Sequence, residues 1–517
     1  MNKFWPLTLA AAASLILSPC SYAQSTADAV YNDYNSAFIV HKGSQTFYSN
    51  SLTDRSPAFM WGQASDIYAA EDYFARTHDV AAQKLIADLL DTFLANNNGA
   101  DWSWDSWNDD TEWGVIACVR GYQITGDTKY LDAAAKNWNM TYNRGWDTKY
   151  GGGGVWENMD NFVHGDGKAD KCSLSNNPLV ITGVALYQIT GDQSYLIKSE
   201  AIYAWERSNV FNTTTGQVNE GVKWVIGKPD SGFLENSDNI YNDGSFTEAA
   251  ECLYRITGNP KYHRDALLAI SHVVSENSIM SYKGQPGNPQ YQYWFVKGLS
   301  DYCTDNKCWN LYYSWLLDNA NQAWKERDTL GLTEDDWLDP QTNANPCALN
   351  ASSAVTIWQV LPPATEVPLS GNYEIVDAGS GLALGVGSKA SHAPVVEGHF
   401  APGAKKVLWS FEPTSGGYYQ IKNAASDLVM TAAAASVLPG SKIVQDPAQG
   451  MIPGSDEWMP IANSDGTYSF YNLNSQQNLD VPAAVNAADT QVDQTTANGA
   501  SSQRFLLRPH TNRNSSP

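Results

Sequence analysis

Apolar residues recur at helical spacing through the first 360 residues, and a repeated phrase marks where helices end. The phrase reads YQITGDTKYL from Tyr122, YQITGDQSYL from Tyr187 and YRITGNPKYH from Tyr254. In each copy a glycine follows the apolar pattern, as a left-handed residue after a helix requires, and the next Asp or Asn can cap a second helix. The pattern therefore predicts helical hairpins arranged in series.

Weaker copies of this pattern begin at Tyr73, where Asp79 is the expected cap, and at Tyr302. With helices expected near residues 26–41 and 348–360, the total is about a dozen helices in successive pairs. Such pairs close most readily into an α/α toroid, and an open solenoid is the competing architecture. Aromatic-rich inserts between the hairpins favour the closed ring, because they would crowd one rim. These inserts span residues 101–112, 145–170 and 211–239.

After Trp358 the pattern changes to the alternation that is typical of strands. A proline-containing segment over residues 361–370 predicts a linker. Three related stretches follow it: YEIVDAGSGLAL from Tyr373, YQIKNAASDLVM from Tyr419 and YSFYNLNSQQNLD from Tyr468. Their aromatic anchors are Trp409, Trp458 and Phe505. Three copies of one strand pattern predict a three-fold all-β structure.

This second part resembles the ricin-type β-trefoil over residues 371–509, a fold often used for sugar binding. The Gln-x-Trp signature of that fold is replaced here by VLW, DEW and QRF, which end at Trp409, Trp458 and Phe505. Residues 510–517 form a short tail.

The composition narrows the class of partner. A chain of 517 residues can bury two cores, and a formal net charge of −23 argues against binding to nucleic acid or anionic membranes. Its 19 tryptophans and 27 tyrosines include flat rings that can stack on a neutral polysaccharide. We expect a monomer.

The first residues have the form of a secretion signal. A basic start, a short apolar stretch and the small residues Ser21 and Ala23 predict a signal peptide over residues 1–23. Lipid attachment at Cys20 is the alternative, which Pro19 disfavours. We therefore expect an extracellular or periplasmic protein without a membrane span.

Six further cysteines suit an oxidising compartment. Cys303 and Cys308 could close a small loop. Cys118 and Cys252 lie in apolar helical patterns, which favour buried thiols at least as strongly as disulfides.

Candidate chemistry concentrates in DWSWDSWNDDTEWG, residues 101–114, where Asp109 and Asp110 are adjacent at a predicted helix start. Plain capping is the common role of an Asp there. Cleavage of a glycosidic bond with retained configuration needs two carboxyl groups about 5–5.5 Å apart, and their repulsion separates their pKa values. The tryptophans around the pair favour this second role. A calcium loop is a third interpretation, but the Asp-x-Asp-x-Asp-Gly order is lacking.

Several separated motifs then match one family in order. The chain resembles glycoside hydrolase family 76, the endo-α-1,6-mannanases, over about residues 26–360, in SWNDDTEW, RGYQITGDTKYLDAA, RGWDTKYGGGGVWEN, LSNNPLVITGVALYQITGD and YNDGSFTEAAECLYRITGN. The resemblance implies an all-α (α/α)6 toroid, assigned here to residues 24–360, that acts through a retaining mechanism. Asp109 then matches the nucleophile and Asp110 the general acid/base. No metal and no organic cofactor is implied.

The same resemblance suggests substrate contacts. Residues 151–156 match a glycine-rich loop beside the family's cleft, where Glu157 replaces a usual second Trp, and Asp243 stands where Gln is more usual. Helix capping or packing is the competing role for each polar candidate. The candidates for sugar contact are Trp102, Trp104, Trp156, Asn176, Tyr241, Asn242 and Asp243.

The sequence thus predicts a secreted enzyme that cuts internal α-1,6-mannosidic bonds of mannan, with an appended sugar-binding-like module. Two alternatives stay open. The same acid pair would serve a cell-wall glycan transglycosylase, and a toroid without activity would leave a carbohydrate-binding protein.

Overall fold

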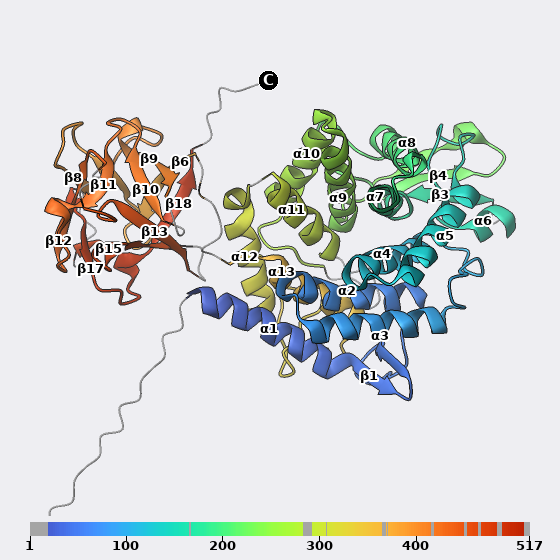
Figure 1. The fold of residues 1–517 in the computed structure, drawn as a ribbon. Helices are drawn as coiled ribbons and strands as arrows, with labels where there is room; N and C mark the ends of the chain where they lie inside the picture. Colours follow the sequence, from blue (N-terminus) through green and yellow to red (C-terminus); the bar gives the residue numbers. More distant parts are fainter. Residues whose placement is uncertain are drawn as a thin grey trace, which may run out of the picture.

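The computed structural model describes residues 19–164, 167–282, 292–306, 308–363, 369, 371–414, 418–448, 452–463, 467–482 and 489–510. A helical part precedes a β-rich part along the chain (Figure 1). Residues 1–18 of the expected signal peptide lie outside the described residues, as do most of the expected linker and residues 511–517 of the expected tail.

Two concentric sets of helices form the helical part. The inner set is α2 (Met60–Thr77), α4 (Asn108–Thr125), α7 (Ser173–Thr190), α9 (Ile240–Thr257), α11 (Tyr293–Asp305) and α13 (Ala348–Val360). The outer set is α1 (Pro19–Phe38), α3 (Val80–Asn96), α5 (Thr128–Gly145), α8 (Gln193–Asn209), α10 (Pro260–Glu276) and α12 (Trp309–Lys325). Each inner helix contacts the next, and α13 contacts both α11 and α2, so the ring is closed. The predicted toroid is confirmed and the open solenoid is excluded.

The repeated turns have the predicted geometry. Gly126, Gly191 and Gly258 end α4, α7 and α9 in the left-handed region, at φ values of 75°, 74° and 65°. Asp127 then accepts a hydrogen bond from the Lys129 amide and caps α5. Glycine suits the turn because a side chain at positive φ would be strained. The equivalent caps of α8 and α10 are Asp192 and Asn259.

Two helix predictions need correction. The helix expected near 26–41 ends at Phe38, because Ile39–Lys42 (β1) pairs with Gln45–Tyr48 (β2). The hairpin expected after Tyr302 forms, but α11 ends at Asp305 without a left-handed turn, since the C-cap residue is Asn306, with φ −91°, and not a glycine. A helix pattern over residues 26–41 does not show that the next residues of the chain form a hairpin partner for its last residues.

Helices α9 and α11 approach unusually closely. A Cβ atom built on Gly244 would lie 2.2 Å from the Phe295 backbone nitrogen, and one on Gly298 would lie 2.6 Å from the Gly244 carbonyl oxygen. Both obstacles are backbone atoms, so no side-chain rotation can relieve them. These two glycines allow the inner ring to close between α9 and α11.

Replacing Gly244 by Ala is expected to destabilise the protein by about 2 kcal/mol or more. Ala would favour the helix by about 1 kcal/mol, but the clash with backbone atoms of α11 outweighs that gain. Urea unfolding measures the change. Ser208→Ala, at an exposed site on α8, should stay within about 0.5 kcal/mol of the parent. Equal stability of Gly244→Ala and the parent would contradict this packing.

The β-rich part is a three-fold barrel. Its six barrel strands are β6 (Asn372–Asp377), β9 (Leu408–Pro413), β10 (Tyr419–Asn423), β13 (Glu457–Ala462), β14 (Tyr468–Asn472) and β18 (Phe505–Pro509). Each pairs with the next, and β18 pairs with β6, which closes the barrel. Three further antiparallel pairs stand at one end. They are β7 (Ala383–Val386) with β8 (Ala393–Gly398), β11 (Val429–Ala432) with β12 (Ser441–Asp446), and β15 (Asn478–Asp480) with β17 (Asp493–Thr495).

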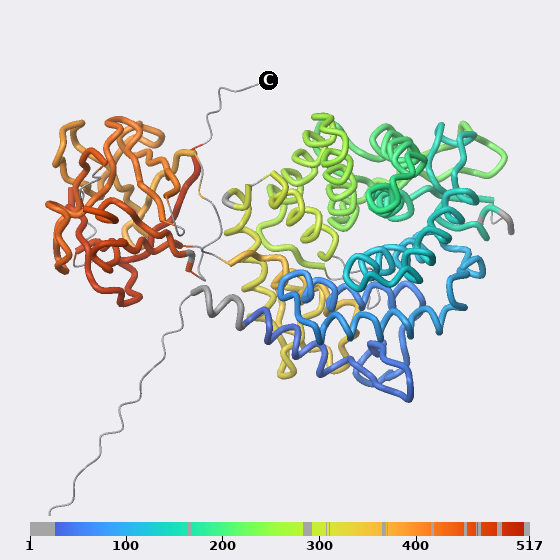
Figure 2. The backbone as a smooth tube through the Cα atoms, in the orientation of Figure 1, coloured from blue at the N-terminus to red at the C-terminus, as the bar shows by residue number. Residues whose placement is uncertain are grey.

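The expected aromatic anchors occupy equivalent core positions. Trp409 and Trp458 are fully buried, and their indole N–H groups donate to the carbonyls of Leu384 and Met430 at 2.9 and 2.8 Å. Phe505 is equally buried but carries no such donor. The β-trefoil prediction is confirmed, and these rings stabilise the fold instead of meeting a ligand. The colours of the tube in Figure 2 show that the β-rich part follows the helical part along the chain.

The six cysteines from Cys118 to Cys347 are free thiols. Cys118 and Cys252 are buried, as their helical patterns suggested, whereas Cys303 and Cys308 hydrogen-bond to each other without forming a bridge. In the part of the chain that the structure describes, no helix combines the length and apolar character required to cross a bilayer.

Candidate active site

Asp109 and Asp110 lie in the first turn of the inner helix α4, as the sequence suggested. Trp107, the N-cap residue of α4, makes no side-chain cap bond, and Asp109 itself accepts from backbone N–H groups of this helix end. Asp109 is partly exposed and Asp110 is 8% exposed. The pair therefore reaches the surface at the end of the ring where the inner helices begin.

The segment before the pair is fixed by a half-buried arginine. Arg144 of α5 donates from Nε to Asn108 Oδ1 at 2.7 Å and from Nη1 to the Asp105 carbonyl at 2.7 Å. Asn108 also donates its amide N–H to the Glu157 carbonyl at 2.8 Å and its side-chain amide to the Trp156 carbonyl at 2.6 Å. Residues 105–108 and 156–158 consequently form one rigid unit beneath the acids.

The two acids have different electrostatic surroundings. Burial raises the pKa of Asp109, and backbone amides at the helix start oppose that rise. Burial raises the pKa of Asp110 too, and the charge of Asp109 raises it further. One oxygen of Asp109, Oδ1, is buried and has no hydrogen-bond partner among the described residues. If one proton remains on the pair, it belongs on Asp110, which leaves Asp109 ionised.

Three more acids surround this pair, and sequence reasoning left them out of the site. Burial and the charge of Asp109 raise the pKa of Glu157, whose side chain hydrogen-bonds to Asp170 on β3 (Lys168–Cys172). Asp105 accepts from the Trp107 amide at 2.9 Å and adds negative potential to both members of the pair. The departure at Glu157 thus places an acid, not an aromatic ring, beside the pair.

The structure divides the tryptophan candidates. Trp104 is 48% exposed and packs edge-on against Phe59, with ring centroids 6.2 Å apart. Trp102 is fully buried and donates its indole N–H to the Gly99 carbonyl, and Trp156 is 2% exposed. Neither ring is exposed in this structure, so sugar stacking by Trp102 and Trp156 stays a prediction that their burial does not favour.

Two exposed rings near the acids were missed as candidates. Trp107, directly before α4, is 40% exposed, and Phe162 of α6 (Met159–His164) is 39% exposed. The sequence signal for Trp107 was its place among the tryptophans that flank the acid pair. Exposed flat rings around a carboxyl pair suit the faces of sugar rings.

Asn176 holds the glycine-rich loop instead of projecting outward. Its side chain is fully buried, accepts from the Val155 amide at 2.8 Å and donates to the carbonyls of Val155 and Cys172. A substrate contact for Asn176 stays a prediction, because its side chain is engaged with the protein backbone in this structure. Its bonds fix the backbone that leads to Glu157.

A buried lysine organises the same loop. The Lys171 ammonium group donates to the carbonyls of Asp147 and Tyr150 at 2.6 and 2.7 Å, and to that of Gly153. It also lies 4.7 Å from the centre of the Trp156 ring. Burial lowers the pKa of Lys171 to about 8. The glycines let the backbone curl around this cation, so their role is structural.

The three candidates at the start of α9 point to internal partners. The Tyr241 hydroxyl and the Asn242 side chain donate to Glu220 Oε2 at 3.0 and 3.1 Å. Asp243 is fully buried, and its Oδ1 accepts from the Val218 amide at 2.8 Å. Both Asn242 and Asp243 are buried, so their contacts with substrate stay predictions that the structure does not favour. Glu220, which the sequence did not single out, is the hub of this network.

Glu112 lies one turn further along α4, with its carboxylate turned toward α7. It is fully buried and accepts from the Thr182 hydroxyl at 3.1 Å, so it does not face a loop site for calcium. Burial raises the pKa of Glu112 from 4.5 to about 8. The folded protein therefore retains a proton that the unfolded chain releases above about pH 4.5, and stability falls as pH rises toward 8.

Replacing Glu112 by Gln is expected to weaken this pH dependence. Gln resembles the protonated acid. From pH 5 to pH 8 the free energy of unfolding of the variant should therefore rise by on the order of 3 kcal/mol relative to that of the parent. Urea unfolding at both pH values measures the gain. Glu276→Gln, at the exposed end of α10, should show no such change. An equal difference at both pH values would contradict a raised pKa for Glu112.

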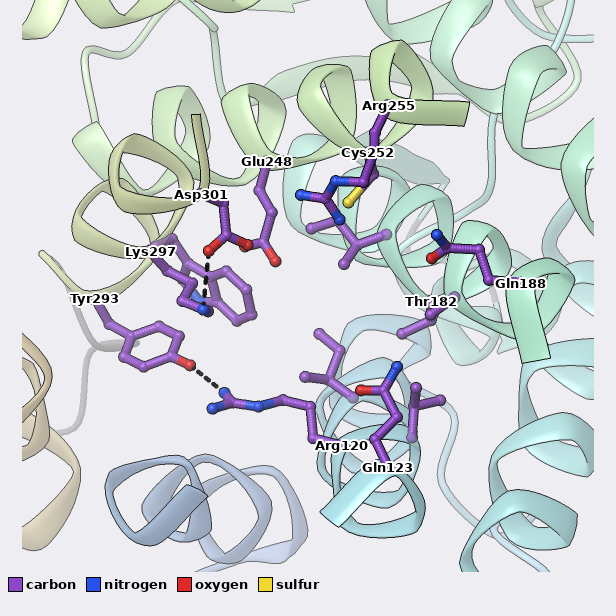
Figure 3. A pocket seen from close by; sticks show the side chains of 15 residues that line it. Arg120, Gln123, Thr182, Gln188, Glu248, Cys252, Arg255, Tyr293, Lys297 and Asp301 are labelled. Atoms are coloured by element: carbon purple, nitrogen blue, oxygen red, sulfur yellow. Dashed lines mark hydrogen bonds and ion pairs between the residues drawn. The ribbon is translucent and has the colours of Figure 1, made fainter. Parts of the chain in front are cut away.

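A cavity of about 190 Å³ lies elsewhere on the ring axis (Figure 3). Arg120, Lys297 and Glu248 line it. Arg120 donates to the Tyr293 hydroxyl at 2.6 Å, and Lys297 donates to Asp301 Oδ1 at 3.1 Å. Arg120 is eleven residues beyond Asp109 on α4, or about 16 Å along the helix. This cavity is separate from the acid pair.

Models of two protein families match the helical part and the start of the β-rich part. The model for glycosyl hydrolase family 76 matches residues 19–362, and that for the ricin-type beta-trefoil lectin domain-like family matches residues 354–446. Mannan endo-1,6-alpha-mannosidase DCW1 of Candida glabrata is 26% identical over 274 residues, which cover 48% of this chain and 58% of that protein. The match thus spans less than two thirds of that relative.

Solved structures share the fold of the helical part. The alpha-1,6-mannanase GH76A of a Salegentibacter species is 22% identical, with a TM-score of 0.58 over 65% of this chain and 98% of that chain. A variant of it with two successive aspartates replaced by alanine is described as inactive and is in complex with alpha-1,6-mannotetrose. A family 76 mannosidase of Bacteroides thetaiotaomicron is 19% identical, with a TM-score of 0.56 over 65% and 97% of the two chains.

Proposed function

The chain belongs to glycosyl hydrolase family 76, and from this premise we propose that it hydrolyses internal α-1,6-mannosidic bonds of mannan with retention of configuration. The observation that carries the proposal is the pair of adjacent acids, Asp109 and Asp110, at the surface end of an inner helix. The curated relative named as a mannan endo-1,6-alpha-mannosidase supports the substrate class.

The surroundings of the pair suit a division of labour. Backbone amides at the start of α4 favour the charged form of Asp109, and its charge in turn favours the protonated form of Asp110. A retaining hydrolase needs one ionised and one protonated carboxyl group at the same time. Asp109 therefore suits the nucleophile and Asp110 the proton donor.

The reaction then has two steps. The Asp109 carboxylate attacks the anomeric carbon and forms a mannosyl ester, while Asp110 gives its proton to the leaving glycosidic oxygen. Water next attacks the same carbon as the Asp110 carboxylate takes its proton, and the ester bond to Asp109 breaks. Both carboxyl groups return to their starting states without a metal or an organic cofactor.

The remaining parts of the chain extend this proposal. Trp104 and Trp107 offer exposed rings on which mannose units can stack beside the acids. We place the catalytic domain at residues 24–360 and the trefoil at residues 371–509. The trefoil would keep the enzyme near its polymer and raise the local substrate concentration. Secretion through the signal peptide at residues 1–23 would bring the enzyme to wall or extracellular mannan.

Product analysis on linear α-1,6-mannan tests the proposal. We expect a rapid fall in polymer length with release of oligomannosides, and proton NMR should detect the α-anomer as the first product. A β-anomer would exclude the retaining mechanism. Longer products on addition of an acceptor glycan would instead favour transfer, and binding without cleavage would favour a carbohydrate-binding protein.

A further inference from the structure

We propose that Asp238, Asp243 and His272 bind a divalent transition metal ion of the zinc type. One ligand atom from each residue lies within 4.8 Å of the other two. Among the residues that the structure describes, this is the only group of three His, Cys, Asp or Glu side chains so arranged. It lies apart from the acid pair in sequence and uses none of the residues assigned to the reaction.

Three separate elements bring these ligands together. Asp243 lies in the first turn of α9, Asp238 lies in the segment just before that helix, and His272 lies on the outer helix α10. The outer helix packs against α9, which sets the imidazole opposite the two carboxylates. Gly216 permits the loop before β4 (Gly221–Val225) to pack against α10, since a Cβ on it would lie 2.2 Å from the Leu268 carbonyl oxygen.

Asp243 supplies the strongest reason for a cation. Its side chain is fully buried, and only Oδ1 has a hydrogen-bond donor, the Val218 amide at 2.8 Å. Its other oxygen, Oδ2, is buried and has no hydrogen-bond partner among the described residues. A buried carboxylate with an unsatisfied oxygen is costly, and a bound cation would remove that cost. Burial and the nearby Asp238 raise the pKa of Asp243, as expected without a cation.

The other two ligands are already spaced as neighbours on one ion. His272 Nε2 lies 2.9 Å from Asp238 Oδ1. Two ligands of a tetrahedral zinc ion, with bonds of about 2.0–2.1 Å, lie roughly 3.3 Å apart. A shift of a few tenths of an ångström would therefore convert this hydrogen bond into joint ligation.

The donor set favours zinc over calcium or magnesium. An imidazole suits zinc and similar transition metals, whereas calcium takes six to eight oxygen ligands. The Asp238 side chain is 55% exposed, so a water molecule can reach the fourth position of a tetrahedral ion. Two carboxylates and a neutral imidazole would balance the double positive charge.

The ion would have a structural role. It would tie the segment that contains Ser237 and Asn239 to α10, and the side chains of these two residues donate to Glu220 at 3.3 and 2.9 Å. Tyr241 and Asn242 complete the same network. The ion would thereby hold the Glu220 network in one arrangement.

Zinc binding to the full chain, after dialysis against EDTA, tests the proposal by calorimetric titration and by the change in Tm. We expect one zinc ion per chain with a micromolar or lower Kd and a rise in Tm, whereas calcium and magnesium at the same concentration should have no effect. Asp238→Asn changes an exposed side chain and should fold normally. It and His272→Gln should each weaken zinc binding by at least tenfold.

The matched control is His263→Gln, which removes an imidazole on the same helix that faces Tyr254 and Tyr302 instead. It should bind zinc like the parent. Lack of saturable zinc binding by the parent would overturn the proposal. So would parent-like binding by Asp238→Asn or His272→Gln, because the ion would then be held elsewhere, for instance by thiols. Neither readout depends on hydrolysis, so the proposed function and the metal site can fail separately.

Discussion

Replacement of Asp109 by Asn is expected to lower kcat/KM on linear α-1,6-mannan by about 10⁴-fold or more. The amide has nearly the same shape but cannot form the mannosyl ester, so the first step has no nucleophile. The pKa of Asp109 is raised in the folded protein, so loss of its carboxyl group should leave Tm unchanged or slightly higher. Reducing-end assays and thermal unfolding on the same sample measure both effects.

Asp101→Asn is the matched control for this variant. Asp101 lies at the start of the same loop, and its half-exposed side chain forms an ion pair with Lys136 at 3.3 Å. Its loss should change activity by less than about twofold, because exposed ion pairs contribute little. If the Asp109→Asn variant retains more than a tenth of the parent activity, Asp109 is not the nucleophile.

Replacement of Asp110 by Asn is expected to lower kcat/KM on mannan by about 10²–10⁴-fold, the usual contribution of a general acid. The loss should depend on the leaving group. A dinitrophenyl α-mannoside releases a phenolate that needs no proton, so its first step should slow by less than about tenfold. Kinetics on both substrates with the parent and the variant give the comparison.

Azide separates the roles of the two acids further. In Asp110→Ala, azide should attack the ester on Asp109 and yield an α-mannosyl azide. In Asp109→Ala, azide should attack the substrate itself and yield the β-azide, because only one displacement then occurs. The reverse pattern of anomers would exchange the two roles, and equal losses on both substrates for Asp110→Asn would exclude proton donation by Asp110.

The local features of the fold could be predicted because they depend on neighbouring residues. A glycine followed by Asp after an apolar helix pattern predicts a left-handed turn and then a capped helix. Gly126 and Asp127 show this geometry. The same reasoning gave α13 its observed limits, Ala348–Val360. It failed at Ile39, where pairing with Tyr48 overrides the helix pattern.

The candidate site was less predictable. Trp102 and Trp104 are two residues apart in one loop, yet only Trp104 is exposed. Asn176 matched a family motif, but the structure uses its amide to hold the Val155 backbone. Glu220 had no signal, because its donors include residues up to 22 positions later in the chain.

Short segments of the chain encode the two folds and the position of Asp109 and Asp110 at a helix start, because periodicity, caps and repeats are local patterns. Long-range packing sets which rings and carboxylates reach the surface and which distant side chains meet, as Asp243 and His272 do. The exposure of a side chain and its contacts with distant residues depend on how the helices pack. For example, the contact between α9 and α10 brings Asp243 and His272 together.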